Sequence, residues 1–298
     1  MSLAPIGIST YSRLGHLKQT IESLQKNTLS KQNELYVFSD APKKGDEEIV
    51  AKVRKYIHTV DGFKKVHIIE RESNSRVFNN RDGMRHLLDE HGRMIFMEDD
   101  NVVSTSFLQF MNDGLDFYKD DKSIMSISGF NVPAEYPTFY ASDCYISRYF
   151  NGWGFATWGD RGFLDIIKYN GQYAEILADK KLYKKIKKAH PILISGLKKI
   201  HEGTLNAGDY KMVFHLIKND LYVIRPIKSF VDNMGHDGSG EHCGVSDRFQ
   251  NSELNTRKIE FIRDLEYDRN LDKQFYLFFH SSISFITRII NKLKRSIK

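Results

Sequence analysis

The chain has 298 residues, and its content of 41% hydrophobic and 28% charged residues is an ordinary balance for a soluble globular protein. Its formal net charge is +6, but five positive charges fall among the last eleven residues, and the other 39 basic residues face 38 acidic ones. This nearly neutral body argues against a general nucleic-acid-binding protein.

In chain order, the first half alternates strand-like and helix-like segments. Residues 1–5 lead directly into a buried strand rather than an apolar signal core, and no run reaches the roughly 18 apolar residues of a spanning helix. The first helix places Leu14, Leu17, Ile21 and Leu24 on one face. This order predicts an α/β fold with a mostly parallel sheet flanked by helices. The expected strands are 5–10, 35–39, 66–70, 94–97 and 124–128, and the expected helices are 14–24, 46–57, 77–88 and 106–117.

From about residue 131 this alternation is lost. Aromatic and glycine-rich segments appear at 136–140 and 151–159, and a strand is expected at 223–226 before a polar loop at 232–244. No internal repeat and no long linker interrupts the chain. We therefore expect one domain over residues 1–265, made of the halves 1–130 and 131–265, and a separate tail over 266–298.

Three acids, Glu98, Asp99 and Asp100, directly follow the apolar strand 94–97. In an open parallel sheet, ligands gather just beyond the carboxyl ends of the strands. Three carboxylates at one place repel one another unless a cation neutralises them, and Mg²⁺ or Mn²⁺ prefers such oxygens together with substrate phosphates. The alternative is a solvated acidic turn that caps the helix starting near Ser106. The position after a buried strand favours the metal site.

Three stretches resemble the donor half of the GT-A glycosyltransferases: 70–74 (Glu-Arg-Glu-Ser-Asn), 79–83 (Asn-Asn-Arg-Asp-Gly) and 97–103 (Met-Glu-Asp-Asp-Asn-Val-Val). They most resemble bacterial family-2-like transferases of surface polysaccharide synthesis, which make lipopolysaccharide or capsule. They are more distantly similar to N-acetylglucosaminyltransferase I, which also has a Glu-Asp-Asp metal motif. The resemblance is good over 5–130 and looser over 150–245.

The resemblance implies a GT-A, Rossmann-like fold with a donor half at 1–130 and an acceptor half at 131–265. It implies a metal-dependent enzyme that moves a hexosyl or N-acetylhexosaminyl group from a nucleotide-sugar donor, with UDP favoured, to a glycan or lipid-linked acceptor. Carried over by position, Asp100 would bind Mn²⁺ or Mg²⁺, while Glu98 and Asp99 would face the ribose and the sugar. The other expected donor contacts are Arg13 near the base or diphosphate, Asp40 at the base, and Asn80 and Arg81 near the nucleotide.

Each of these last residues has a simpler interpretation from the sequence alone. Arg13 can be a solvated arginine at a helix start, Asp40 a turn residue, and Asn80 and Arg81 part of an exposed helical face. These alternatives stay open at this point.

Asp209 is the expected general base, because relatives carry an acidic-aromatic motif here that serves inverting transfer, and a positioned carboxylate can take the acceptor proton. The alternative is that Asp209 is the N-cap of the helix it opens. His236, in the glycine-rich loop, would be a second metal ligand or a phosphate contact on a loop that closes over the donor, or else a surface residue. Trp153, Phe155 and Trp158 would form a wall of the acceptor site, or else belong to the core.

The end of the chain predicts a basic amphipathic helix. Residues 286, 289, 290, 293 and 297 are apolar at helical spacing, with basic residues between them and the apolar run 275–279 before them. Such a helix is expected to lie on an anionic membrane surface, although docking on the body or on another subunit is the alternative. A lysine cluster within 180–188 is expected to be a solvated helix face.

The two cysteines, Cys144 and Cys243, are too few for a disulfide scaffold, lack zinc-finger spacing and suit a reducing compartment. We therefore expect a cytoplasmic protein that associates peripherally with the inner face of the membrane. Two other functions remain in view. A sugar nucleotidyltransferase usually needs a glycine-rich loop after the first strand, and residues 10–15 contain one glycine. A non-catalytic nucleotide-sugar or glycan-binding protein would not depend on Asp100 or Asp209.

Overall fold

The computed structural model describes residues 2–133, 142–239 and 253–280, together with 136, 245–246 and 249. The first half contains β1 (Ile6–Thr10), α1 (Leu14–Gln25), β2 (Glu34–Ser39), α2 (Glu47–Ile57), β3 (Lys65–Glu70), α3 (Arg76–His91), β4 (Arg93–Glu98), β5 (Asn101–Val103), α4 (Phe107–Phe117) and β6 (Ile124–Ser128). The second half contains β7 (Cys144–Ser147), β8 (Phe155–Trp158), α5 (Phe163–Lys168), α6 (Gln172–Ala178), α7 (Lys180–Ala189), α8 (Leu193–His201), α9 (Gly208–Asn219), β9 (Tyr222–Pro226), β10 (Val231–Asn233) and α10 (Arg269–His280). Short 3-10 turns lie at Ser30–Gln32 and Gly159–Arg161.

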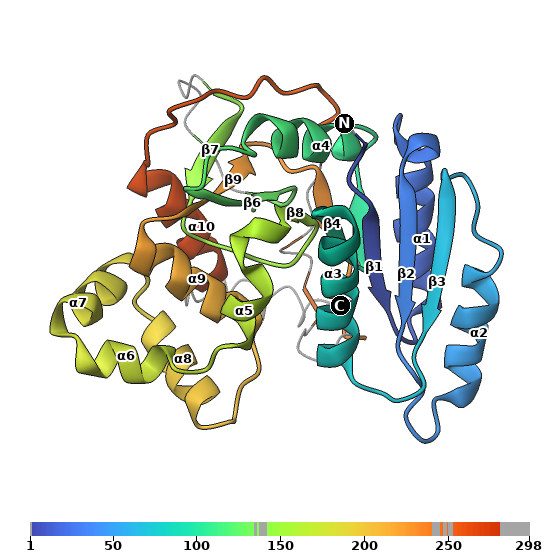
Figure 1. Cartoon of the computed structure of the whole chain (residues 1–298), viewed down its shortest axis with the longest axis horizontal. Coiled ribbons are helices and arrows are strands. Elements are labelled where there is room, and N and C mark those ends of the chain that lie inside the picture. Colours follow the sequence, from blue (N-terminus) through green and yellow to red (C-terminus); the bar gives the residue numbers. More distant parts are fainter. Residues whose placement is uncertain are drawn as a thin grey trace, which may run out of the picture.

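One large sheet with the strand order β3-β2-β1-β4-β8-β6-β9-β7 runs through the molecule (Figure 1). The strands β1 to β4, β6 and β9 point in one direction, whereas β7 and β8 run against them. The α/β fold with a mostly parallel sheet is therefore confirmed. A separate antiparallel pair joins β5 to β10, so that a late segment of the chain lies directly after β4.

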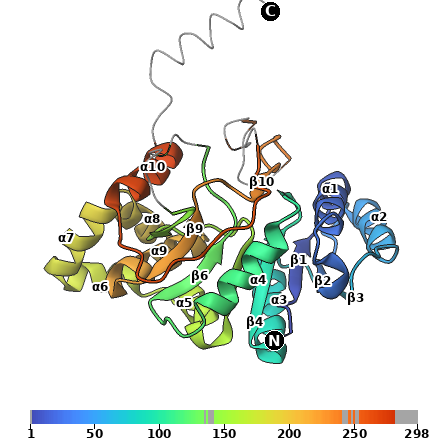
Figure 2. The ribbon, with the colours of Figure 1, turned by 90° about the horizontal axis from the view of Figure 1, so that it is seen from above.

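The sheet separates two apolar cores, because successive side chains of a strand point to opposite faces. In β2, Leu35 and Val37 pack in one core and Tyr36 and Phe38 in the other. Helices α1, α2, α4 and α10 contribute to the first core, and α3 and α5 to α9 to the second. Figure 2 shows α1 and α2 at one end of the molecule and α6, α7 and α10 at the other.

The nine elements expected up to residue 128 all occur, with ends that differ by a few residues. Local signals explain the borders of α3: the Ser75 side chain accepts a hydrogen bond from the backbone N–H of Phe78 at 3.3 Å, and Gly92 ends the helix with a φ of 70°. In the second half, the expected strand 223–226 corresponds to β9, but β7 and β8 were not predicted.

Arg225 of β9 is fully buried and ties the second half together. Its guanidinium donates to the carbonyl oxygens of Phe130 at 2.5 Å and Tyr149 at 3.0 Å, and its Cζ lies 4.1 Å from the ring centre of Phe275 in α10. This one side chain therefore joins the sheet, the segment after β7 and the C-terminal helix.

Arg225→Ala is expected to lower the free energy of unfolding by about 1–3 kcal/mol, because the buried Tyr149 carbonyl is left without a donor, whereas the Phe130 carbonyl keeps a hydrogen bond from Ser128 Oγ. Urea denaturation measures the change. Arg85→Ala, at an exposed position of α3, is the matched control and should leave the unfolding midpoint nearly unchanged. Equal losses in the two variants would contradict this role of Arg225.

The C-terminal helix α10 packs against the body. Phe275 and Leu271 are buried, and the Asp272 carboxylate accepts hydrogen bonds from Ser147 Oγ at 2.5 Å and the Arg148 backbone N–H at 2.9 Å. No helix among the described residues is long and apolar enough to cross a bilayer. The expected basic helix at 286–298, like Cys243, lies outside the described residues, so the division at residue 266 stays a prediction.

Candidate active site

A cleft of about 340 Å³ opens at the carboxyl ends of β1, β2 and β4. The parallel register sets Ser9 beside Glu98 and Thr10 beside Ser39, which brings the loops after these strands together. Of the residues expected at the donor, the lining includes Arg13, Asp40, Asn80, Glu98, Asp99 and Asp100; it also includes Ser9, Thr10, Tyr11, Ser12, Lys43, Asn74, Arg76, Asn79 and Ser239.

Asp99 and Asp100 are buried carboxylates, with relative exposures of 4% and 6%, and do not form a solvated turn. Asp99 accepts hydrogen bonds from Thr10 Oγ1 at 3.0 Å and from Arg13. Asp100 Oδ1 accepts from the side-chain amides of Asn101 at 2.8 Å and Asn233 at 3.1 Å, and Asp100 Oδ2 lies 2.8 Å from Arg13 Nη2. The guanidinium of Arg13 therefore bridges both carboxylates.

Negative charge accumulates in this cleft. Burial raises the pKa of Asp99, while the positive charge of Arg13 opposes that shift. Burial, together with the carboxylates of Asp100, Asp209 and Asp99, raises the pKa of the half-buried Glu98 to about 8. A site that disfavours its own ionised carboxylates is one to which a cation binds favourably.

The loop after β10 lies against Asp100. The backbone N–H of Met234 donates to the Asp100 carbonyl at 2.9 Å, and a Cβ on Gly235 would stand 2.2 Å from Asp100 Oδ2, so this position leaves room for the carboxylate only as glycine. His236 follows; its Nε2 is buried and has no hydrogen-bond partner in the described part of the chain. Burial lowers the pKa of His236, which favours the neutral imidazole that binds metals, and Asp100 opposes the shift.

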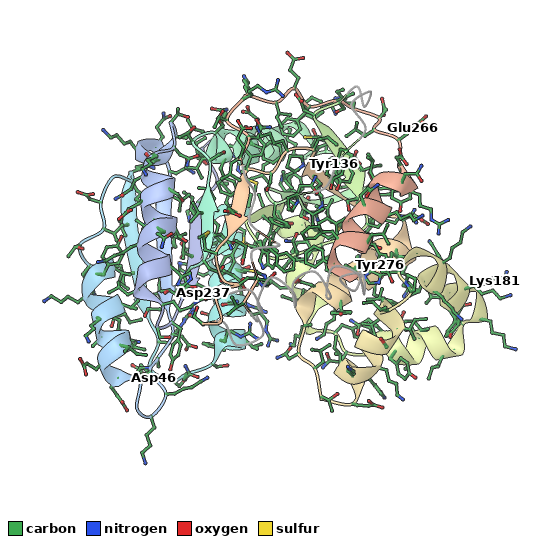
Figure 3. All side chains as sticks on the ribbon, turned by 180° about the vertical axis from the view of Figure 1, so that it is seen from behind. Asp46, Tyr136, Lys181, Asp237, Glu266 and Tyr276 are labelled. Atoms are coloured by element: carbon green, nitrogen blue, oxygen red, sulfur yellow. The ribbon has the colours of Figure 1, made fainter. Side chains whose placement is uncertain are left out.

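These residues fit a divalent cation that shares its ligands with a substrate. Asp100 offers a fixed carboxylate and His236 an unpartnered ring nitrogen from the neighbouring loop, which Figure 3 marks by Asp237. Within the part of the chain that the structure describes, no three His, Cys, Asp or Glu side chains are arranged to hold a metal by themselves. Phosphate oxygens would complete such a site, as Mg²⁺ sites in proteins commonly require.

At the far end of the cleft, Asp40 is buried and organises the backbone around it. Its Oδ1 accepts from the N–H groups of Ala41 at 2.9 Å and Ser75 at 3.0 Å, and its Oδ2 accepts from Asn74 Nδ2 at 3.2 Å. The Asn80 Oδ1 accepts from Ser9 Oγ in the same cleft. Asp40 therefore lines the cleft and also fastens the start of α3.

Arg81 is not part of this lining. Its charge acts instead on Lys211 in α9: burial is the main cause that lowers the pKa of this lysine, and the positive charge of Arg81 lowers it further. Two neighbouring residues of α3 do line the cleft but were not predicted. Asn79 is buried and donates to the Phe38 carbonyl at 2.9 Å, and Arg76 lowers the pKa of both Glu98 and Asp209. The position of Arg76 next to the N-cap Ser75 is the signal that could have identified it.

Asp209 lies opposite the acidic cluster at the start of α9, whose N-cap is Ala207, so the alternative of an N-cap role is wrong. Solvent reaches its side chain, but the residue stands in a hollow with protein on most sides. This partial removal from water raises the pKa of Asp209 to about 6, against the opposing effects of a hydrogen bond from the Gly152 backbone and of Arg76. The carboxylate is near enough to Glu98 to raise the pKa of that residue.

The three predicted aromatic contacts lie in different surroundings. Trp153 is partly buried, with its ring centre 5.5 Å from that of His236. Phe155 and Trp158 in β8 are exposed by only 2% and 6%, and Trp158 Nε1 donates to the Leu115 carbonyl at 3.1 Å. These two side chains cannot contact an acceptor without unpacking the core, so the prediction that they line the acceptor site does not fit the structure.

The first half of the chain is similar to a known protein family. Residues 6–150 match the family described as Glycosyl transferase family 2. No curated protein matched the chain. The chain is similar to a solved structure of S. aureus TarS (13% identity, TM-score 0.39, covering 80% of this chain and 37% of that one). It is also similar to the mannosyltransferase PcManGT from Pyrobaculum calidifontis in complex with GDP-Man and Mn²⁺ (12% identity, TM-score 0.40, covering 72% of this chain and 69% of that one). It is also similar to the galactosyltransferase LgtC in complex with donor and acceptor sugar analogs (10% identity, TM-score 0.38, covering 74% of this chain and 72% of that one). The chain thus spans little more than a third of the length of TarS.

Proposed function

We propose that this chain, whose residues 6–150 match the family described as Glycosyl transferase family 2, is an enzyme that moves a hexosyl or N-acetylhexosaminyl group from a nucleotide diphosphate donor to an acceptor hydroxyl. The observation that carries the proposal is the presence of two buried carboxylates, Asp99 and Asp100, directly after β4, together with a third carboxylate, Asp209, whose charge acts on Glu98 in the same cleft. The family match also favours sugar transfer over nucleotidyl transfer or non-catalytic binding.

Asp100 and His236 would hold Mn²⁺ or Mg²⁺, and the ion would stabilise the negative charge of the leaving diphosphate. Arg13 and Arg76 place two more positive charges along the same cleft. Asp40 would contact the base and Asn80 the nucleotide, while Glu98 and Asp99 would face the ribose and the sugar. UDP is the favoured nucleotide. A bacterial role in lipopolysaccharide or capsule synthesis, and location at the inner face of the membrane, belong to the proposal and rest on the resemblance and on the tail.

The chemistry assigned to Asp209 is that of a general base in a single displacement. The acceptor oxygen forms a bond to the anomeric carbon while its proton passes to the Asp209 carboxylate. The bond from that carbon to the diphosphate oxygen breaks, and the diphosphate leaves with the electron pair. Attack from the face opposite the leaving group inverts the anomeric centre.

The rate should follow the ionisation of Asp209. The carboxylate must be deprotonated to accept a proton, and its pKa of about 6 places half-ionisation there. The kcat/KM for the acceptor is therefore expected to fall about tenfold per pH unit below that value and to level off above it. A pH–rate profile at saturating Mn²⁺ tests this expectation, and a profile that is flat through pH 6 and down to the ordinary aspartate pKa of about 4 would rule Asp209 out as the base.

Thermal unfolding in the presence of nucleotide sugars, with and without Mn²⁺, tests the function as a whole. A donor that binds the folded state raises the melting temperature, and the rise should require the metal. UDP-hexoses, UDP-N-acetylhexosamines and GDP-mannose form the panel. Stabilisation by one class identifies the donor, and no response to any of them would reject donor binding in this cleft.

A further inference from the structure

A second cavity of about 140 Å³ is lined in part by Asp209 and shares no lining residue with the donor cleft. It is formed by the segment after β7 and by α8, α9 and α10. The rings that line it are Tyr149, Phe150, His190, Tyr210, Phe275, Tyr276 and Phe279. Asp209 belongs to this lining, and its charge also acts on Glu98 in the donor cleft, so this residue lies between the two hollows.

The aromatic walls are held in place by ring contacts between α10 and the body. The ring centre of Tyr149 lies 5.4 Å from that of Phe275 and 6.3 Å from that of Tyr276, and His190 lies 5.4 Å from Tyr276. Figure 3 marks Tyr276 on α10. The helix thus supplies one wall of a cavity whose other walls come from residues 149–213.

One polar group in this cavity lacks a partner. Asn151 is 5% exposed, and its Nδ2 makes no hydrogen bond to any residue the structure describes. Its Oδ1 accepts from Arg225 Nη1 at 3.3 Å, which fixes the orientation of the amide. A buried donor left unpaired costs about 1–3 kcal/mol, so a ligand with an acceptor oxygen at this position would be favoured.

We propose that this cavity binds the acceptor as a pyranose ring and that α10 is a wall of the acceptor site. The inference rests on the proposed function and specifies its acceptor. Aromatic faces suit the apolar C–H face of a pyranose, the Asn151 amide suits a ring hydroxyl or carbonyl oxygen, and Asp209 stands where another hydroxyl of the sugar would lose its proton. A lipid chain would leave the polar atoms of Asn151 and Asp209 unsatisfied, which disfavours it as the occupant.

The family match ends at residue 150, whereas the cavity is lined almost entirely by later residues. Acceptor recognition is thereby assigned to the C-terminal half, including a helix that the sequence alone grouped with a membrane-binding tail. Donor binding depends on a different set of side chains, so the two can be tested separately.

Saturation-transfer NMR in the presence of UDP and Mg²⁺, which is diamagnetic, tests the assignment. The three probes are methyl β-D-glucopyranoside, methyl β-D-galactopyranoside and methyl N-acetyl-β-D-glucosaminide. At least one glycoside should receive saturation from the wild-type protein. Asn151→Asp, which keeps the oxygen that Arg225 contacts, and Tyr276→Ala should each weaken its binding by about tenfold. Leu277→Ala, on the same helix but 41% exposed and outside the lining, is the matched control and should bind as wild type does.

All four proteins should be stabilised equally by UDP with Mn²⁺, which shows that each variant is folded and that the donor cleft is intact. Loss of this response in the wild type would reject the proposed function itself. With the response retained, the pocket assignment is overturned if no glycoside binds the wild type, if both variants bind as tightly as the control, or if octan-1-ol receives saturation from the aromatic residues and the glycosides do not.

Discussion

Asp209→Asn should reduce kcat for sugar transfer by about 10²–10⁴-fold, the usual contribution of a positioned general base. The amide is nearly the same shape as the carboxylate and can still accept the hydrogen bond from Gly152, but it cannot accept a proton. Because Asp209 lies outside the lining of the donor cleft, the affinity for the nucleotide sugar should remain unchanged. Single-turnover rates and donor titrations measure the two quantities separately.

Asp89→Asn, at an exposed position of α3, makes the same chemical change elsewhere and should leave kcat unaffected. Assignment of the anomeric configuration of the product gives an independent check. A product with retained configuration would show that the reaction does not proceed by the single displacement in which Asp209 serves as base.

Asp100→Ala is expected to abolish the stimulation of turnover by Mn²⁺ and to lower kcat by about 10³-fold, since a metal at a developing phosphate charge contributes several kcal/mol. The substitution removes the carboxylate that Asn101 and Asn233 orient, whereas Arg13 keeps its contact with Asp99. Initial rates over a range of Mn²⁺ concentrations test the expectation.

The comparison requires a folded variant with an unaltered sheet. Circular dichroism and the melting temperature provide that check, and Asp61→Ala, an exposed aspartate before β3, serves as the matched substitution. If Asp100→Ala kept the metal dependence of the wild type, the ion would have to be bound elsewhere, and the assignment of the acidic triplet would be wrong.

The first half of the fold could be predicted because its strands pair with strands that are close to them in the sequence, so that local patterns of apolar residues are sufficient. β1, β2 and β4 each contain a short buried apolar stretch, and the helices between the strands have an apolar face, as in Leu17, Ile21 and Leu24 of α1. The second half depends on pairings that no local pattern records. β8 has only four residues and is inserted antiparallel between β4 and β6, while β7, the strand before it in the chain, lies at the far edge of the sheet.

The same distinction applies to the site. The position of Asp99 and Asp100 in the cleft could be predicted because they follow a predicted strand, which implied a place at the edge of the sheet. Phe155 and Trp158 were misplaced because a glycine-rich aromatic run gives no sign of which rings face the core until the pairing of β8 is known. Arg76 was overlooked because only the packing of α3 beside β1 and β4 brings its charge to Glu98 and Asp209.

The antiparallel pair β5–β10 has a thermodynamic consequence. It joins Asp100 to the segment that carries His236, whose ring stacks on Phe249 at 4.0 Å, and Phe249 in turn lies 5.4 Å from Phe279 of α10. A continuous row of contacts thus connects the acidic cluster to the helix beside the second cavity. If metal binding at Asp100 moves these residues, a ligand in the donor cleft changes the dissociation constant of a ligand in the second cavity. By linkage, a ligand in the second cavity then changes the dissociation constant in the donor cleft by the same factor.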